Sequence, residues 1–181
     1  NDPSGTTSTA EYNVALGTTA LDAITTGDKN TAIGYNAMTT FTAGTGNTVV
    51  GYDAGVNITE GQYNTLLGIE AGGDITTGLY NVCLGGGAGS RLTTGEGFNT
   101  FVGQGAGTLL TNTLSVALGY IAGGGGNGGS TCVAIGGRAG YSSTSGGYSN
   151  TYVGYHTGYY VTTGRDNVMI GVSSGGGGAP G

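Results

Sequence analysis

Positive charge is scarce in this chain of 181 residues. Four residues are Lys or Arg against ten Asp or Glu, so the formal net charge is -6 at pH 7. Binding to nucleic acid or to an anionic membrane surface needs clustered Lys and Arg. No stretch approaches the roughly 20 apolar residues that span a bilayer. The composition therefore argues against nucleic-acid binding, membrane-surface binding and membrane insertion.

Residues that catalyse reactions or bind metals are also few. His156 is the only histidine, so the chain lacks the usual pairing of a nucleophile with a base. Asp53, Glu70 and Asp74 lie near the corners of the repeat described below, with no spacing that defines a catalytic pair. Neither a metal-ligand cluster nor a calcium-binding Gly-Gly-x-Gly-x-Asp nonapeptide is found. The sequence predicts a protein without catalysis, metal or cofactor.

Glycine, in contrast, supplies 43 of the 181 residues. The glycines do not follow the Gly-X-Y triplet of collagen, and they fall at fixed positions rather than in low-complexity runs. A five-residue motif recurs ten times: Asn, a β-branched residue, an apolar residue, Val/Ile/Leu, then Gly. The glycines that close the motif are spaced by 16 to 18 residues, at Gly17, Gly34, Gly51, Gly68, Gly85, Gly103, Gly119, Gly136, Gly154 and Gly171.

A period held over nearly the whole chain indicates a stacked architecture, because one short repeat cannot bury its own apolar face. We expect an all-β parallel β-solenoid, a β-roll or β-helix of ten coils of about 17 residues. The repeats cover residues 13–175. An irregular N-terminal flank at residues 1–12 precedes them, and a glycine-rich tail at residues 176–181 follows.

The chain has only two cysteines, Cys83 in the fifth repeat and Cys132 in the eighth. Three coils of about 4.8 Å would separate them by roughly 14 Å, which is too far for a disulfide. We expect both to be buried as small apolar side chains.

The motif places three residues in each expected strand, numbered here from the Asn as position zero. Position one is β-branched in every repeat, and position three is always Leu, Ile or Val. Residues two apart on a strand share a face, so these positions form one apolar stripe. We expect this stripe to face the interior of the coil, with Val50, Leu67, Leu84 and Val102 in one buried column.

Position two lies on the opposite face of the strand and is also mainly apolar. A strand that is apolar on both faces is normally buried on both. The interior of the coil covers only one face, so we expect other chains to cover the second, as a homotrimer packed side by side or intertwined. The expected oligomer interface includes Leu66, Phe101, Tyr152 and Met169.

Asn occupies position zero in eight of the ten repeats. Amides stacked one coil apart can hydrogen-bond along the axis, so a structural ladder is expected. The glycine at position four marks a bend at which a Cβ would clash or φ must be positive. The expected ladder includes Asn30, Asn47, Asn64, Asn81 and Asn99.

The remainder of each repeat predicts a return leg. Position eleven carries an apolar anchor in seven repeats, and a glycine turn closes most of the coils. Each coil is therefore expected to contain two short strands joined by two glycine turns. The anchors are Ile24, Phe41, Ile58, Ile75, Leu92, Leu110 and Val161.

The phrases Asn-Val-Ala-Leu-Gly, Ser-Val-Ala-Leu-Gly and Cys-Val-Ala-Ile-Gly resemble the head repeat of trimeric autotransporter adhesins. The segment Asn30-Thr31-Ala32-Ile33-Gly34, with the Thr-Thr-Gly between copies, is similar to repeats of bacteriophage tail fibres. The resemblance covers about residues 13–175. It implies a trimeric parallel β-roll in an extracellular place, on a virion tail fibre or a bacterial cell surface, with a role in attachment.

The expected function is that of a structural fibre or adhesin segment, a rigid rod that projects from a surface. Aromatic residues gather near its C-terminal end, and exposed Tyr gives rigid amphipathic contact area. The candidate contacts for a cell-surface receptor or glycan are Tyr155, His156, Tyr159 and Tyr160.

Three other interpretations stay open. Tyr155 shares position five with Tyr35, Tyr52 and Tyr120, and these rings could simply stack along the axis. The chain could instead be a self-assembling extracellular filament subunit, because neither flank resembles the polar cap that closes most solenoids. An ice-binding solenoid is the third, since Thr recurs at position twelve.

Overall fold

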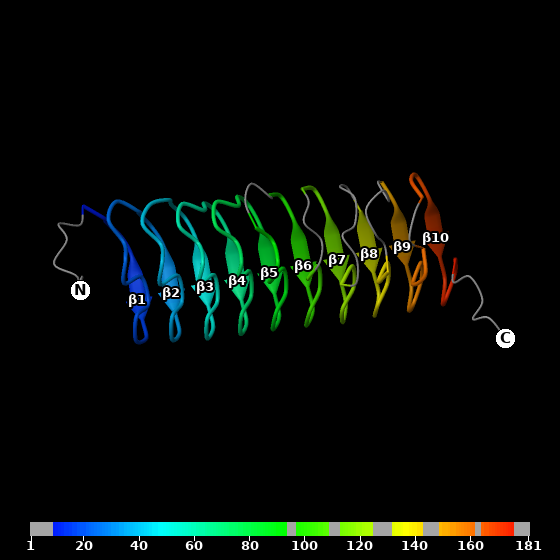
Figure 1. The fold of residues 1–181 in the computed structure, drawn as a ribbon, viewed down its shortest axis with the longest axis horizontal. Helices are drawn as coiled ribbons and strands as arrows, with labels where there is room; N and C mark the ends of the chain where they lie inside the picture. The colour runs from blue at the N-terminus through cyan, green and yellow to red at the C-terminus, as the bar shows by residue number, and fades with distance from the viewer. Residues whose placement is uncertain are drawn as a thin grey trace.

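The computed structural model describes residues 9–93, 97–108, 113–124, 132–142, 149–161 and 164–175. The predicted anchor Leu110, residues 1–8 of the N-terminal flank and the tail at residues 176–181 lie outside these ranges. Within them the chain forms an elongated rod, with β1 at one end and β10 at the other (Figure 1).

Ten strands of three residues form a single parallel sheet, in which each strand pairs with the next along the chain. Equivalent positions are in register, so that Leu66 pairs with Cys83. The described ranges contain no helix, and the predicted all-β parallel solenoid is confirmed. The strands are β1 (Val14–Leu16), β2 (Thr31–Ile33), β3 (Thr48–Val50), β4 (Thr65–Leu67), β5 (Val82–Leu84), β6 (Thr100–Val102), β7 (Val116–Leu118), β8 (Val133–Ile135), β9 (Thr151–Val153) and β10 (Val168–Ile170).

The two faces of the sheet are the reverse of the prediction. Leu66 at position two is fully buried inside the coil, whereas its neighbour Leu67 at position three is 39% exposed. The predicted buried column is therefore wrong: Leu67 and Val102 are exposed, and Val50 and Leu84 are half-buried on the outer face. The predicted alternation of faces along the strand is confirmed, but the face predicted to point into the coil points outward.

The core is built from positions two, seven and eleven. Position seven is a buried Ala in seven repeats, and the anchors Phe41, Ile58, Ile75 and Leu92 at position eleven are fully buried. These residues and position two form one continuous apolar cluster along the rod. The predicted anchor column is confirmed for these four repeats, and Ile24 and Val161 pack partly buried against the same cluster.

Large side chains at position two depend on a small residue at position eight. A Cβ at Gly158 would lie 2.3 Å from the Tyr152 ring, so the ring fits only because position eight is Gly. Where position eight is the buried Met38, position two of the same coil is Ala32. In these two coils positions two and eight share one volume, and close packing leaves no room for a large side chain at both.

The glycine at position four allows adjacent coils to approach closely. Gly51 has a φ of 147°, and a Cβ there would lie 2.2 Å from the carbonyl oxygen of Gly68 in the next coil. Both the backbone conformation and the space exclude a side chain, as the sequence predicts for this position.

The return leg is less regular than predicted. The described part of the chain contains one strand per repeat, and the return leg shows only isolated bridges such as Asp28 with Thr45 and Gln62 with Leu79. The prediction of two strands per coil is wrong because left-handed residues interrupt the extended backbone. Tyr63 and Tyr80, with φ of 55° and 57°, are two of them.

Buried asparagines form the ladder that the spacing predicts. The Asn47 Nδ2 group donates to Asn30 Oδ1 at 2.9 Å and to the Gly61 carbonyl at 2.8 Å, and the Asn47 backbone N–H donates to the same Asn30 oxygen at 3.0 Å. The same side-chain bond joins Asn64 to Asn47, Asn81 to Asn64 and Asn99 to Asn81. Each amide therefore joins adjacent coils, and the Gly61 bond also ties the return leg to the strand.

Candidate functional site

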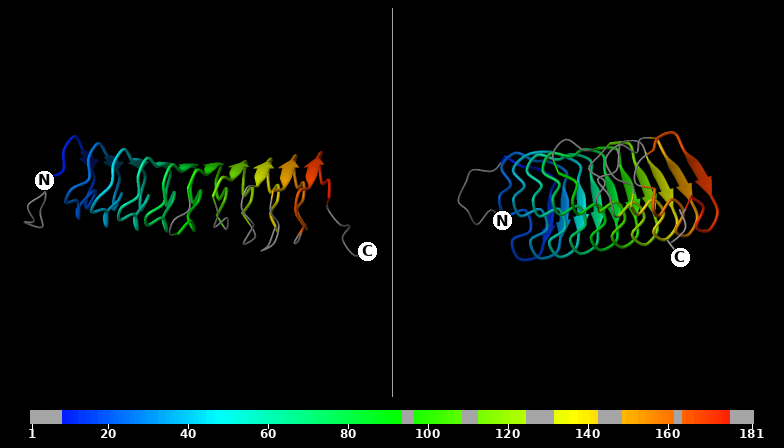
Figure 2. Two further views of the ribbon diagram at one scale, coloured as in Figure 1. Left: turned by 90° about the horizontal axis from the view of Figure 1, so that it is seen from above. Right: turned by 45° about the vertical axis from the view of Figure 1, so that its right-hand side comes forward.

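The outer face of the sheet is a surface that repeats in every coil of the rod. All ten strands lie along one side of the molecule (Figure 2). Positions one and three point outward from every strand, and none of these side chains is buried. The outer face thus carries a column of Thr and Val beside a column of Leu, Ile and Val. In this single chain no other segment among the described residues packs over the strands.

The residues predicted as the oligomer interface are not on this surface. Leu66 and Phe101 are fully buried, and Tyr152 is 1% exposed. Met169 packs partly buried against the same core cluster. These four residues fill the interior of the coil, so their assignment to an interface is wrong. Apolar residues that the fold leaves exposed on this surface include Leu67, Val102 and Ile135 at position three.

The structure brings together the four aromatic residues proposed as receptor contacts. The Tyr155 and His156 rings stack with centroids 4.1 Å apart, and the His156 and Tyr159 centroids are 4.9 Å apart. Tyr159 and Tyr160 meet edge to face at 4.7 Å. Tyr155 and Tyr160 are 56% and 58% exposed. The C-terminal aromatic cluster, defined as these four residues, is therefore one continuous group with exposed tyrosines at both ends.

Two further features border the C-terminal aromatic cluster. Tyr141 stacks on Tyr159 with centroids 5.0 Å apart, which extends the cluster into the preceding coil. The Arg138 guanidinium lies over the Tyr120 ring, 5.8 Å from its centroid. The Nε2 atom of His156 is buried without a hydrogen-bond partner among the described residues, because rings pack on the imidazole.

Stacking along the axis occurs in the other half of the rod. Tyr35 and Tyr52, both at position five, stack with centroids 5.3 Å apart, as the alternative interpretation predicts. Sequence reasoning missed a second column, Tyr63, Tyr80 and Phe98, with centroids 5.0 Å apart at each step. Each of these three residues directly precedes the Asn of its repeat, and that shared place was the available signal.

The Thr column at position twelve does not form a free hydroxyl array. The hydroxyls of Thr25, Thr42 and Thr59 each donate to the backbone carbonyl of the equivalent residue in the next coil. The donor bond of each hydroxyl is therefore used inside the rod. This arrangement weakens the ice-binding interpretation, which needs outward hydroxyls.

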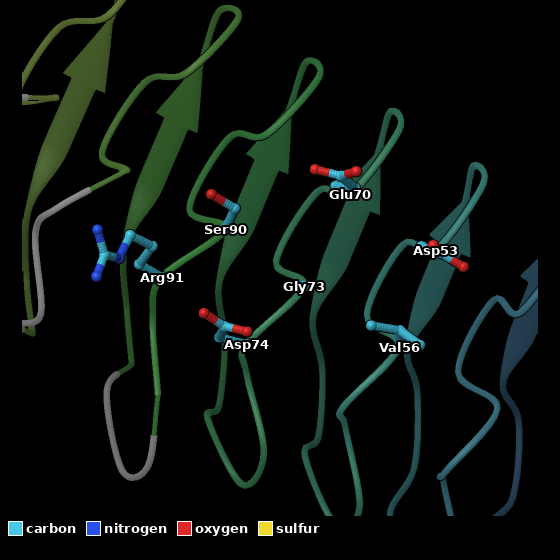
Figure 3. Close-up of a pocket in the computed structure, with 7 residues that line it drawn as sticks. All are labelled: Asp53, Val56, Glu70, Gly73, Asp74, Ser90 and Arg91. Atoms are coloured by element: carbon cyan, nitrogen blue, oxygen red, sulfur yellow. The ribbon is translucent and has the colours of Figure 1, made fainter.

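An acidic groove of about 530 Å³ lies near the corners of the third to fifth coils. Its lining includes Asp53, Glu70 and Asp74, and the Arg91 side chain points away from Asp74 (Figure 3). The Asp53 carboxylate raises the pKa of the neighbouring Tyr52. Asp53 and Asp74 each accept a hydrogen bond from an Asn one coil away. These bonds give both carboxylates a structural partner.

The described residues contain no group of three or more His, Cys, Asp or Glu placed to hold a metal ion. Neither Cys83 nor Cys132 forms a disulfide, and both are buried, as predicted. Burial raises the pKa of the Cys83 thiol to about 12. In the ranges that the structure describes, no helix is long and apolar enough to cross a membrane.

Comparison with known proteins adds no family assignment. No protein-family model matches the chain, and no curated protein or solved structure matches it.

Proposed function

We propose that this chain is a rigid rod segment of an extracellular fibre or adhesin that self-associates through the outer face of its sheet. The observation that carries the proposal is the apolar column at position three, which runs through all ten strands without burial. Soluble monomers rarely expose a long continuous apolar patch, because covering it removes apolar surface from water. A second copy of the chain offers the same column at the same spacing.

Symmetric association covers the outward-facing apolar residue at position three in every coil at once. In a parallel side-by-side assembly, each repeat meets an equivalent repeat of its partner. An end-to-end filament of single chains leaves the outer face bare, so the side-by-side arrangement is favoured over the filament. The likeness of the repeats to adhesin heads and tail fibres favours three chains and a virion or bacterial surface. The rod then holds the C-terminal aromatic cluster away from that surface for attachment.

The test is native mass. The proposal expects a wild-type particle of about three times the 17.6 kDa chain, measured by light scattering or mass photometry. Leu67→Lys combined with Val102→Lys places charges on the outer face and is expected to give folded monomers. Leu79→Lys is the matched control, because Leu79 is 37% exposed, almost the same as Leu67, but lies on the return leg.

A monomeric wild-type protein would contradict self-association, and a trimer that persists in the double lysine variant would exclude this interface. If the double lysine variant does not fold, Leu67→Thr with Val102→Thr replaces it. Thr is a good strand former and already occupies position one of β4 and β6, so this pair removes apolar surface without placing a charge in the sheet.

A further inference from the structure

The two halves of the chain differ sharply in charge. Residues 1–96 contain two cations, Lys29 and Arg91, against nine acids. Residues 97–181 contain Arg138 and Arg165 against a single acid, Asp166. The C-terminal half therefore has a formal charge of +1, in a chain whose total is -6. The C-terminal aromatic cluster lies in this locally basic half.

Arg138 is placed beside that cluster by the repeat. Arg138 and His156 both occupy position six, in adjacent coils. The two corners lie side by side, since the His156 backbone N–H donates to the Gly137 carbonyl at 3.0 Å. Both residues have a φ of 55°. Strand spacing places their backbones roughly 4.8 Å apart. The Arg138 guanidinium lies over the Tyr120 ring of the preceding coil, 5.8 Å from its centroid, and the His156 ring stacks on Tyr155 of its own coil. No ion pair to an acidic residue is found for Arg138 in the described part of the chain.

Gly137 leaves an opening in the tyrosine column of the same corner. Tyr120, Gly137 and Tyr155 occupy position five in three successive coils. Because Gly137 has no side chain, the Tyr155 ring leans over it, with Cδ2 3.2 Å from the place of a Cβ. The exposed Tyr155 ring thus covers the side-chain-free step, with the exposed Tyr120 ring and the Arg138 guanidinium on one side of it and the His156 imidazole stacked on the Tyr155 ring.

We infer that this corner binds an anionic pyranose, a sugar ring that carries a carboxylate. Arg138 pairs with the carboxylate, since a guanidinium matches its two oxygens with parallel donors. The exposed ring of Tyr155 packs against the apolar face of the sugar, which a tyrosine covers at little entropic cost. The inference rests on the proposed attachment function and names its ligand class. Repulsion from the strongly negative N-terminal half disfavours binding of an acidic sugar there, so this corner is the expected place.

The experiment is calorimetric titration of the assembled wild-type protein with a tetramer of galacturonic acid. Its fully methyl-esterified form is the neutral comparison, because it has the same ring sequence without the charge. The inference expects binding of the acid that weakens as salt is raised, and at least about tenfold weaker binding of the ester. Penta-glutamate, an acidic peptide of similar charge, is expected to bind at least about tenfold more weakly than the acid.

Variants locate the site. Arg138→Gln is expected to raise the dissociation constant for the acid at least about tenfold, and Tyr155→Ala about fivefold. Their matched controls are Arg91→Gln and Tyr52→Ala, which remove an arginine and an equally exposed position-five tyrosine from the acidic half. Both controls are expected to leave binding unchanged. Circular dichroism and native mass confirm that each variant keeps the assembled fold.

Any of four results would overturn the inference, the first three of which compare measured affinities. These three are equal binding of the acid and its ester, equal binding of penta-glutamate, and unchanged binding in Arg138→Gln with native fold. Absence of binding to the acid at millimolar concentration also overturns it. None of these results alters the native mass of the wild-type particle, so failure of the ligand assignment is distinguished from failure of the rod proposal.

Discussion

The Phe101 ring occupies the space in which a side chain at Gly107 would begin, since a Cβ at Gly107 would lie 2.5 Å from Phe101 Cδ2. The same relationship links Tyr152 with Gly158 and Met169 with Gly175. In these three coils positions two and eight therefore share one volume. A glycine at position eight allows a side chain as large as Phe or Tyr at position two.

Gly107→Ala is therefore expected to lower the free energy of unfolding more than Gly105→Ala. Gly105 and Gly107 both have a φ of 64°, but a Cβ at Gly105 meets its nearest atom at 3.4 Å, an ordinary contact. Gly105→Ala thus measures backbone strain alone, at about 1 kcal/mol. Gly107→Ala adds overpacking of about 1–3 kcal/mol. Denaturant unfolding of both variants provides the comparison.

A double variant tests whether Phe101 and Gly107 share one volume. Phe101→Ala removes the ring that Gly107→Ala would overlap, so the combined loss of stability is expected to be smaller than the sum of the single losses. Additive losses would show that the two positions do not share a volume.

Asn47→Ala is expected to cost about 2–4 kcal/mol of stability, because it removes the amide oxygen and nitrogen of a fully buried ladder residue. The Asn64 amide and backbone N–H and the Gly61 carbonyl all lose a partner. Asn57→Ala is the control, since Asn57 makes one exposed hydrogen bond of 3.4 Å to Asp74. Asn57→Ala should change stability by less than about 0.5 kcal/mol. Equal effects in thermal unfolding would contradict a stabilising role for the ladder.

Because the Cys83 thiol is buried, we expect the protein to lose stability at alkaline pH. Burial raises the pKa of this thiol in the folded chain to about 12, from the ordinary thiol value of 9.0. The contribution of the protonated Cys83 thiol to the free energy of unfolding is fully present below pH 9. It is lost as pH rises toward 12, because only the unfolded chain releases the thiol proton in that range. The expected slope between these values is up to about 1.4 kcal/mol per pH unit.

Cys83→Ala supplies the measurement, because it removes the thiol and keeps every tyrosine. The difference in unfolding free energy between wild type and Cys83→Ala is compared at pH 7.5 and pH 10. Wild type should lose about 1 kcal/mol more than the variant over this interval. Parallel pH profiles would show that the thiol is not buried in the folded protein.

Much of the architecture could be predicted from the sequence because the period and the residue types act locally. The three motif positions after the Asn coincide with all ten strands, from Val14–Leu16 to Val168–Ile170. The Asn ladder and the position-eleven anchors follow from one-coil spacing, since stacking brings identical residues into contact. The gathering of Tyr155, His156, Tyr159 and Tyr160 is consistent with their closeness in sequence.

The inward face of the strand was not specified by these patterns. Positions two and three are both mainly apolar and position one is Thr or Val, so a period of two fits either orientation. The tertiary structure decides it through the corner after Gly154, which folds Gly158 against Tyr152 across the coil and leaves Val153 on the outer face. The sequence by itself determined the strands, the stacking and the ladder, which depend on neighbours along the chain or one period away. The three-dimensional turn decided which apolar column became core and which remained available to a partner, because volume sharing between positions two and eight exists only once the coil is closed.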